Sequence, residues 1–404
     1  MQYPQRIALL ITCLVAIGLI SFTNTKPIQN KLDYSGSNGL FIEYKDGLQI
    51  KWITNKEDSG LITLRTLDNT VIKKGRTSSS RSHSFNVNHT IDEPIFLEIG
   101  GENSEKKTIK LRPKSKLENA IYRNVDSIYV VGDVHGRYNQ LTNLLHKSNL
   151  INSDLEWIGG KAHLVFLGDL FDRGDDVTKV LWFIYELEEK ARLKGGKVHV
   201  VLGNHEIMVM SKDLRYLSRK EASIPFAHGV TYDYLFHPNK SLLGAWLSKK
   251  ASVIKIDNAI LAHGGIVDLG APSINDFNKT TAEYIQKEAF LDLMKEHADS
   301  TKYDANEWAT IQNHFYHPDS PFWFRGYVYQ DTLAPQLNAM LRKYNAKLHV
   351  VAHTPQETIT ERYKGKLLTT DLNDAATELL LLVRDKKKYH RFKINGEGKI
   401  NELK

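Results

Sequence analysis

Cysteine is almost absent from this sequence. The only one among its 404 residues is Cys13, which lies in an apolar run near the N-terminus. A single thiol cannot form a disulfide within the chain, and once that run is removed no cysteine remains to bind a metal or act as a nucleophile. Any metal ion must then be held by histidine, aspartate, glutamate or asparagine side chains.

The N-terminus lacks an apolar run of membrane-spanning length. The run from Ile7 to Ile20 is shorter than a typical transmembrane helix, which needs about 20 residues. Arg6 precedes it, as a positive charge precedes the apolar region of a secretory signal. We therefore expect residues 1–26 to be a signal peptide and the protein to be exported, either to a periplasm or out of the cell. The alternative is an uncleaved anchor, which would be the only expected contact with a membrane.

A strong charge imbalance is missing as well. The formal net charge is +7, hydrophobic residues make up 41% of the chain and charged residues 25%. These are values of a globular protein, so wholesale disorder is excluded. The mild positive excess suits anionic substrates, although a solvated basic surface explains it more simply. We expect no nucleic-acid partner.

Residues 27–116 have the pattern of a small all-β domain. Short alternating runs such as "LQIKWI", "LITLRTL" and "IFLEIG" are separated by Gly, Asn, Asp and Ser. Strands at this spacing predict a β-sandwich, with Trp52 as a central core residue. No cluster of catalytic residue types lies here, so we expect a packing or docking module that hydrolysis of a small aryl phosphate does not need.

Residues 117–404 alternate strand-like apolar runs with helical patterns, which predicts an α/β fold. Five of these runs end in polar loops, and the carboxyl ends of strands are where α/β sheets place ligands. Oxygen and imidazole groups of this kind suit Zn, Mn or Fe. The polar residues of the five loops are Asp133 and His135; Asp169, Asp172 and Arg173; Asn204, His205 and Glu206; His263; and His353.

Each fragment alone is a common turn, but the five occur in an order that resembles a known family. "GDVHG", "GDLFDRG", "GNHE", "HGG" and "AHT" are similar to the motifs of calcineurin-like metallophosphoesterases, and more narrowly to those of the PPP phosphoprotein phosphatases. "LLGAWLSKK" and "DSPFWFRGY" resemble segments of the Shewanella-like phosphatases within that group. The resemblance covers about residues 127 to 356. It implies a β-sandwich core flanked by helices.

The resemblance also implies a role for each site residue. Asp133 and His135 would bind a first metal ion, Asp169 would bridge two ions, and Asn204, His263 and His353 would complete the second site. Two divalent or trivalent ions (Mn, Fe or Zn) about 3.5–4 Å apart can share the hydroxide that attacks phosphorus. His205 would protonate the leaving group, Asp172 would orient His205, and Arg173 and Arg325 would bind the phosphate.

Three residues outside these motifs also carry expectations. Asp175 and Asp176 are expected at the start of a helix, as its N-cap and an acid of its first turn. Asp371 follows a further strand-like run and is a candidate to contact the metal ligands without binding the metal itself.

The function that follows is hydrolysis of phosphate monoesters. The leading hypothesis is a phosphoprotein phosphatase, with phosphotyrosine as one substrate. The alternative is a hydrolase of small phosphoesters such as nucleotides or dinucleoside polyphosphates. A catalytically inactive binding protein is disfavoured, because His205, Asp172 and Arg173 are all present.

Overall fold

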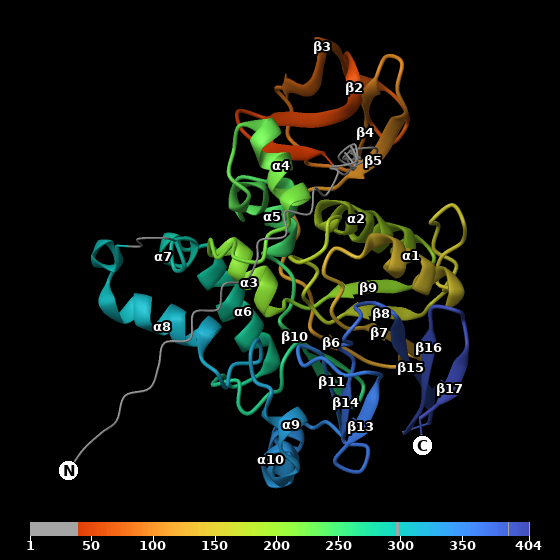
Figure 1. Ribbon diagram of the computed structural model, residues 1–404, viewed down its shortest axis with the longest axis vertical. Helices are drawn as coiled ribbons and strands as arrows, with labels where there is room; N and C mark the ends of the chain where they lie inside the picture. Colours follow the sequence, from red (N-terminus) through yellow and green to blue (C-terminus); the bar gives the residue numbers. More distant parts are fainter. Residues whose placement is uncertain (1–38, 296–298, 387, 404) are drawn as a thin grey trace, which may run out of the picture. The chain divides into compact units, whose positions relative to one another are not determined.

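The computed structural model describes residues 39–295, 299–386 and 388–403 (Figure 1). The expected signal peptide or anchor, residues 1–26, lies outside this range. Within it, no helix combines the length and the apolar character that a membrane crossing requires.

The N-terminal part is one five-stranded antiparallel sheet. The long strand β2 pairs with β3 along most of its length, with β1 at its start and with β4 at its end, and β5 follows β4. Trp52 is 2% exposed and its indole N–H donates to the Gly100 carbonyl at 3.2 Å, so its core position is confirmed. The strands are β1 (Phe41–Tyr44), β2 (Leu48–Arg65), β3 (Val71–Val87), β4 (Ile95–Gly101) and β5 (Lys106–Leu111).

This sheet differs in detail from the expected sandwich, because its strands form one hydrogen-bonded sheet rather than two. Register shifts between Ile53 and Asp58 interrupt the pairing of β2 with β3, in a segment whose residues favour turns. The Asp58 carboxylate is buried there and accepts hydrogen bonds from Ser59, Asn103 and Ser104. The chain therefore bends without leaving the sheet.

The N-terminal sheet is fastened to the rest of the protein through helix α2 (Val177–Leu193) (Figure 1). The Trp182 indole donates to the Leu40 carbonyl at 3.1 Å. Arg112 donates to the Tyr185 carbonyl at 2.7 Å and to Glu188 at 3.1 Å. These contacts are partly or fully buried, so the sheet is packed against the body and is not a loosely tethered module.

The main body contains two six-stranded sheets, as expected for a β-sandwich core. One has the order β17-β16-β15-β7-β8-β9 and the other β13-β14-β12-β11-β10-β6. One face of each contributes to a common apolar cluster that includes Val130, Val165, Leu261 and Val350. The strands are β6 (Ile121–Tyr122), β7 (Ser127–Val131), β8 (His163–Phe166), β9 (Lys197–Val200), β10 (Val253–Ile256), β11 (Ala259–Ala262), β12 (Leu348–Val351), β13 (Thr360–Arg362), β14 (Leu367–Thr369), β15 (Glu378–Asp385), β16 (Lys388–Asn395) and β17 (Ile400–Glu402).

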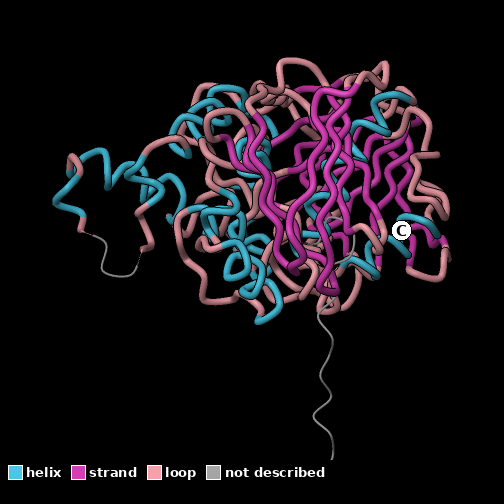
Figure 2. The backbone as a smooth tube through the Cα atoms, turned by 90° about the horizontal axis from the view of Figure 1, so that it is seen from above, coloured by secondary structure: helices cyan, strands magenta, loops and turns pink. Residues whose placement is uncertain are grey.

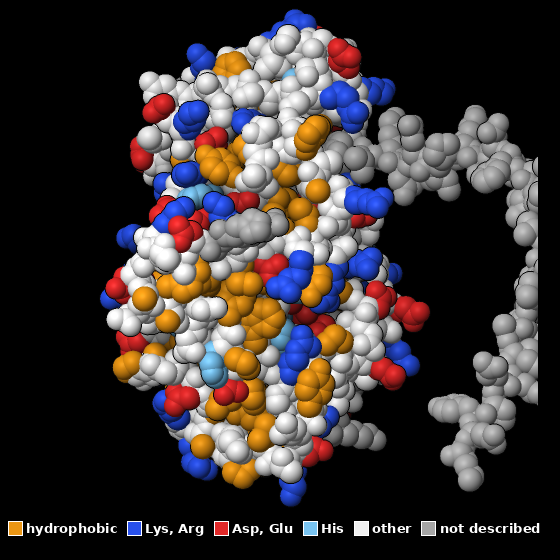
Figure 3. All heavy atoms as spheres, turned by 60° about the vertical axis from the view of Figure 1, so that its left-hand side comes forward, with side chains coloured by type: hydrophobic (Ala, Val, Ile, Leu, Met, Phe, Trp, Pro, Cys, Tyr) orange, Lys and Arg blue, Asp and Glu red, His pale blue; other side chains and the backbone are white. Residues whose placement is uncertain are grey.

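Helices flank these strands (Figure 2). In the face shown in Figure 3, basic and acidic side chains are interspersed and hydrophobic side chains gather between them. Besides α2, the helices are α1 (Tyr138–Lys147), α3 (Asn204–Met210), α4 (Arg219–His228), α5 (Leu242–Leu247), α6 (Ile274–Ile285), α7 (Glu288–Leu291), α8 (Ala305–Tyr316), α9 (Gly326–Tyr329) and α10 (Ala334–Lys343), with 3-10 turns at Asp233–Phe236, Ser300–Lys302 and Asp331–Leu333.

Asp175 and Asp176 precede α2 directly, so their expected place at the start of a helix is confirmed, but the expected side-chain cap and first-turn acid are wrong. Asp176 occupies the N-cap position, but its carboxylate makes no capping hydrogen bond and pairs with Lys220 at 2.6 Å. The first turn contains no acidic residue. Instead the buried Glu221 of α4 accepts hydrogen bonds from the backbone N–H and the hydroxyl of Thr178, at 3.1 and 2.7 Å. A carboxylate from another helix therefore satisfies the start of α2.

Six strand ends meet where the two sheets adjoin. Strands β7, β8 and β9 run parallel in one sheet, and β11, β12 and β14 run parallel in the other. At Gly132, just after β7, an added Cβ would lie 2.2 Å from the Thr370 carbonyl oxygen beyond β14. Only glycine permits this approach. The carboxyl ends of both sheets are thereby brought together.

Candidate metal centre and active site

The backbone of the site is strained at several functional positions. A left-handed φ is uncommon for residues other than glycine and, in such sparsely populated regions, costs on the order of 1–3 kcal/mol. Such strain persists only where the surrounding structure enforces it. Five of the sequence-predicted site residues adopt it, namely His135 (φ 47°), Asp169 (52°), Asp172 (66°), Arg173 (63°) and His353 (65°).

Glu206 enforces the bend after β8. Its fully buried carboxylate accepts the backbone N–H groups of Gly203, Asp169 and Leu170 at 2.7, 2.8 and 2.7 Å. Gly203 allows this packing, since an added Cβ would lie 2.4 Å from Asp169 Oδ1. Sequence reasoning assigned Glu206 no role. The sequence marked Glu206 only as an acid in the "GNHE" motif for which the implied mechanism has no use.

The first group of ligand-type side chains is Asp133, His135 and Asp169. His135 donates from Nδ1 to the Phe171 carbonyl at 2.7 Å, which leaves Nε2 with a lone pair. Nε2 lies 3.5 Å from Asp133 Oδ2 and 4.0 Å from Asp169 Oδ2. It is buried and has no hydrogen-bond partner in the described part of the chain. A buried lone pair beside two carboxylates is the arrangement that a metal ion satisfies.

The second group surrounds His263. Its Nδ1 donates to the Leu167 carbonyl at 2.6 Å, while Nε2 lies 2.9 Å from Asn204 Oδ1, 3.1 Å from His353 Nδ1 and 3.2 Å from Asp169 Oδ2. His353 in turn donates its backbone N–H to Asp133 at 3.2 Å, which links the two groups.

The electrostatics of the second group favour a positive charge. Burial lowers the pKa of His263, but Asp169 outweighs it and raises that pKa to about 10. Burial and the neighbouring His263 lower the pKa of His353 to about 2, which keeps that ring neutral as a metal ligand must be. Burial opposes ionisation of Asp169, but the surrounding imidazoles hold its pKa well below the ordinary range. A cation bound here would meet the ionised Asp169 and the neutral His353, and would take the place of the proton on His263.

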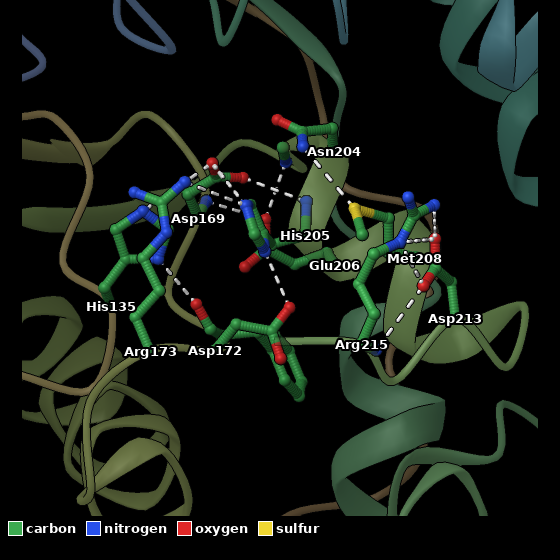
Figure 4. Close-up of polar contacts among 12 residues, drawn as sticks. His135, Asp169, Asp172, Arg173, Asn204, His205, Glu206, Met208, Asp213 and Arg215 are labelled. Carbon is green, nitrogen blue, oxygen red and sulfur yellow. Dashed lines mark hydrogen bonds and ion pairs between the residues drawn. The ribbon is translucent and has the colours of Figure 1, made fainter. Parts of the chain in front are cut away.

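His205 lies beside these groups (Figure 4). Its Nδ1 is 2.6 Å from Asp172 Oδ2, and its Nε2 is 3.8 Å from Asp169 Oδ2 and 3.4 Å from Arg173 Nη2. Burial lowers the pKa of His205, but Asp169 and Asp172 outweigh it and raise the pKa. His205 is also near enough to His135 and Asp169 for the three to hold an ion, with ligand atoms within 4.8 Å of one another. Distance alone therefore does not separate a ligand role from an acid role.

The remaining predicted residues lie at the rim or behind the ligands. Arg173 is exposed, and Arg325, at the N-cap of α9, is close enough to His353 to lower its pKa. Asp371 is buried after β14 and lies close to Asp133; burial and then the charge of Asp133 raise the pKa of Asp371 to about 9. Asp371, a candidate from the sequence, therefore lies beside the ligand Asp133 in a sixth loop.

Two aromatic residues at the site were missed. Tyr216 has its ring centroid 5.4 Å from that of His205, and Trp323 has its ring centroid 5.8 Å from that of His353. Tyr216 stands in no motif and in no loop that directly follows a strand. Trp323 lies within "DSPFWFRGY", but the resemblance noted for that segment implied no role for it.

Comparisons with known proteins agree with this arrangement. The family model for calcineurin-like phosphoesterases matches residues 127–357. Shewanella-like protein phosphatase 1 of Plasmodium berghei is 27% identical over 301 residues, which cover 71% of this chain and 73% of that protein. The symmetrical bis(5'-nucleosyl)-tetraphosphatase of Wigglesworthia glossinidia brevipalpis is 34% identical over 145 residues, 35% of this chain and 45% of that protein.

A solved structure extends the likeness beyond the family motifs. A mutant of cold-active protein tyrosine phosphatase is 27% identical, with a TM-score of 0.63 over 78% of this chain and 97% of that one. The family match spans more than half of the described chain and includes every predicted metal ligand. The chain therefore belongs to the calcineurin-like phosphoesterase family and is a metal-dependent phosphatase.

Proposed function

We propose that this protein is a phosphomonoesterase with two metal ions that acts on phosphoproteins, including phosphotyrosyl proteins. The observation that carries the proposal is Asp169, a single carboxylate shared by two groups of ligand-type side chains, with His205 beside it. The names of a protein phosphatase relative and of a protein tyrosine phosphatase structure support the substrate class.

The residues present fit a pair of cations. Asp133, His135 and Asp169 would hold one ion, and Asp169, Asn204, His263 and His353 the other; oxygen and imidazole donors of this kind suit Mn, Fe or Zn. When bound, such ions supply positive charge to the phosphate and make water acidic enough to act as a nucleophile near neutral pH.

The chain itself would supply binding and a proton. Arg173 lies beside His205 and Arg325 lies near His353, and their guanidinium groups suit phosphate oxygens. His205 would donate a proton from Nε2 to the leaving oxygen, because its Nδ1 is held by Asp172 at 2.6 Å.

Hydrolysis of small phosphoesters is the second candidate. It is favoured by the 34% identity to a bis(5'-nucleosyl)-tetraphosphatase, although that match spans under half of the relative. Both candidates use the same metal groups and differ only in what the walls of the site accept.

A panel of substrates separates the two. The protein, reconstituted with Mn, Fe or Zn, would be assayed on phosphotyrosyl, phosphoseryl and phosphothreonyl forms of one peptide, and on nucleotides and diadenosine tetraphosphate. We expect the highest kcat/KM on a phosphopeptide, with Asp169→Asn as the control for contaminating phosphatases. Preference for a nucleotide would favour the second candidate, and no turnover of any substrate would contradict both.

We also propose export, on the basis of Arg6 and the apolar run from Ile7 to Ile20. Expression of the full chain in a bacterium, followed by fractionation and N-terminal sequencing, tests it. A periplasmic product that begins near residue 26 supports a cleaved signal. An intact chain in the membrane fraction would instead identify an anchor, and an intact soluble chain in the cytoplasm would contradict both.

A further inference from the structure

The segment between α3 and α4 places an open aromatic ring next to His205. Tyr216 is 46% exposed, its ring centroid is 5.4 Å from that of His205, and its carbonyl accepts the backbone N–H of Arg173 at 3.0 Å. Tyr216 therefore adjoins both the proposed proton donor and a proposed phosphate-binding arginine.

The ring is held in place by its neighbours. Asp213 is 7% exposed and binds the Arg215 guanidinium at two atoms, with Nε 2.9 Å from Oδ1 and Nη2 2.5 Å from Oδ2. The guanidinium carbon of Arg215 lies over the Tyr216 ring, 5.8 Å from its centroid. An arginine fixed by a nearly buried carboxylate thus restrains the aromatic side chain.

The position of Tyr216 next to His205 determines which part of a substrate can contact Tyr216. A general acid must lie within hydrogen-bond reach of the oxygen that leaves with the organic group. The organic part of the substrate therefore emerges on the His205 side, next to the half-exposed Tyr216. A phosphotyrosyl substrate would bring a phenyl ring to this place, whereas a phosphoseryl substrate would bring one methylene group.

We propose that Tyr216 is a specificity-determining residue that packs against the aromatic leaving group of phosphotyrosyl substrates. The inference rests on the proposed function, because it needs a phosphomonoesterase with its acid at His205. Aromatic pairs of this kind contribute about two- to twelvefold in an equilibrium or rate constant. The phenyl ring gains that contact and the seryl methylene does not.

The test compares two peptides that differ only in carrying phosphotyrosine or phosphoserine at one position. For Tyr216→Leu we expect kcat/KM to fall about two- to twelvefold on the phosphotyrosyl peptide, mainly through KM, and to change less than about twofold on the phosphoseryl peptide. Tyr216→Phe should keep the wild-type ratio, because the ring and not the hydroxyl makes the contact. Phe226→Leu is the matched control, since Phe226 is an 88% exposed aromatic residue on α4.

A second measurement removes the chemical step. The inhibition constant of phenylphosphonate should rise in Tyr216→Leu while that of methylphosphonate stays unchanged. Equal losses on both peptides and both inhibitors would overturn the proposal, since they would show that Tyr216 only positions His205 or Arg173. A changed ratio in Tyr216→Phe would overturn it as well. If the wild-type protein hydrolyses neither peptide, the proposed function fails instead, and this proposal fails with it.

Discussion

At the scale of single residues, replacing His205 tests whether it is a general acid or a metal ligand. If it protonates the leaving group, His205→Asn should retain its metal and lose about 10²–10⁴-fold in kcat on a phosphoseryl peptide, whose alkoxide needs the proton. An aryl phosphate with an acidic phenol should lose much less. Metal analysis and kinetics on both substrates check this. Equal losses accompanied by loss of metal would identify His205 as a ligand.

The individual residues also show how far sequence reasoning reaches. The places of Asp133, His135 and His263 at strand ends were predictable because each follows a buried strand whose apolar run is easy to recognise. Glu206 and Tyr216 were not, because their roles depend on contacts across the fold. Glu206 satisfies backbone groups 36 and 37 positions away, and Tyr216 approaches His205 from a loop without a motif.

At the scale of secondary-structure elements, the α2–α4 contact predicts a pH dependence of stability. Burial raises the pKa of Glu221 from about 4.5 to about 7. Because the folded state holds the proton more tightly, this group's contribution is complete below pH 4.5 and is lost as the pH rises through 7. Between pH 5 and 8 the wild type should lose about 2–3 kcal/mol relative to Glu221→Gln.

Denaturant unfolding of wild-type protein and Glu221→Gln at a series of pH values measures that difference. The comparison cancels every other titrating group, since both proteins share them. Parallel stability curves for the two proteins would show that the Glu221 carboxyl ionises with an ordinary pKa in the folded protein, and would contradict a pKa raised by burial.

Strand boundaries were harder to predict than the presence of strands. The runs "LQIKWI" and "LITLRTL" suggested two strands separated by a turn, but both belong to β2. The polar residues between them form a bulge stabilised by Asp58, and turns and bulges use the same residue types. Local composition therefore could not tell a bent strand from two short ones.

At the scale of the whole molecule, Arg112 joins the N-terminal sheet to the body. Its guanidinium carbon lies 4.0 Å from the Tyr185 ring centroid, and its partner Glu188 has a side chain only 10% exposed. Arg112→Met should lower the free energy of unfolding by about 2 kcal/mol, the usual contribution of a hydrogen bond to a charged group.

Arg76 provides a matched control, since it pairs with Glu102 on the same sheet with both side chains well exposed. Arg76→Met should cost about 0.5 kcal/mol or less. Chemical denaturation of the two variants measures both losses in the free energy of unfolding. We expect kcat on an aryl phosphate to stay unchanged in both variants. A loss in Arg112→Met of about 0.5 kcal/mol or less, as predicted for Arg76→Met, would contradict a stabilising contact of the sheet with α2.

The two-sheet core was predictable as a whole because its strands are continuous apolar runs and its motifs occur in a recognisable order. The attachment of the N-terminal sheet was not predictable. It depends on contacts between residues far apart in the sequence, such as Trp182 with Leu40 and Arg112 with Tyr185.

Metal content and turnover, measured together on wild-type protein and Asp169→Asn, test the central claim most directly. Asp169 is the one carboxylate shared by both ligand groups, so its loss leaves two closely spaced cations poorly neutralised. We expect about two ions per wild-type chain, and in Asp169→Asn a loss of bound metal together with turnover of phosphopeptides and aryl phosphates. A folded Asp169→Asn protein that keeps its full metal content, or a metal-free wild type that hydrolyses substrate at the full rate, would contradict the account.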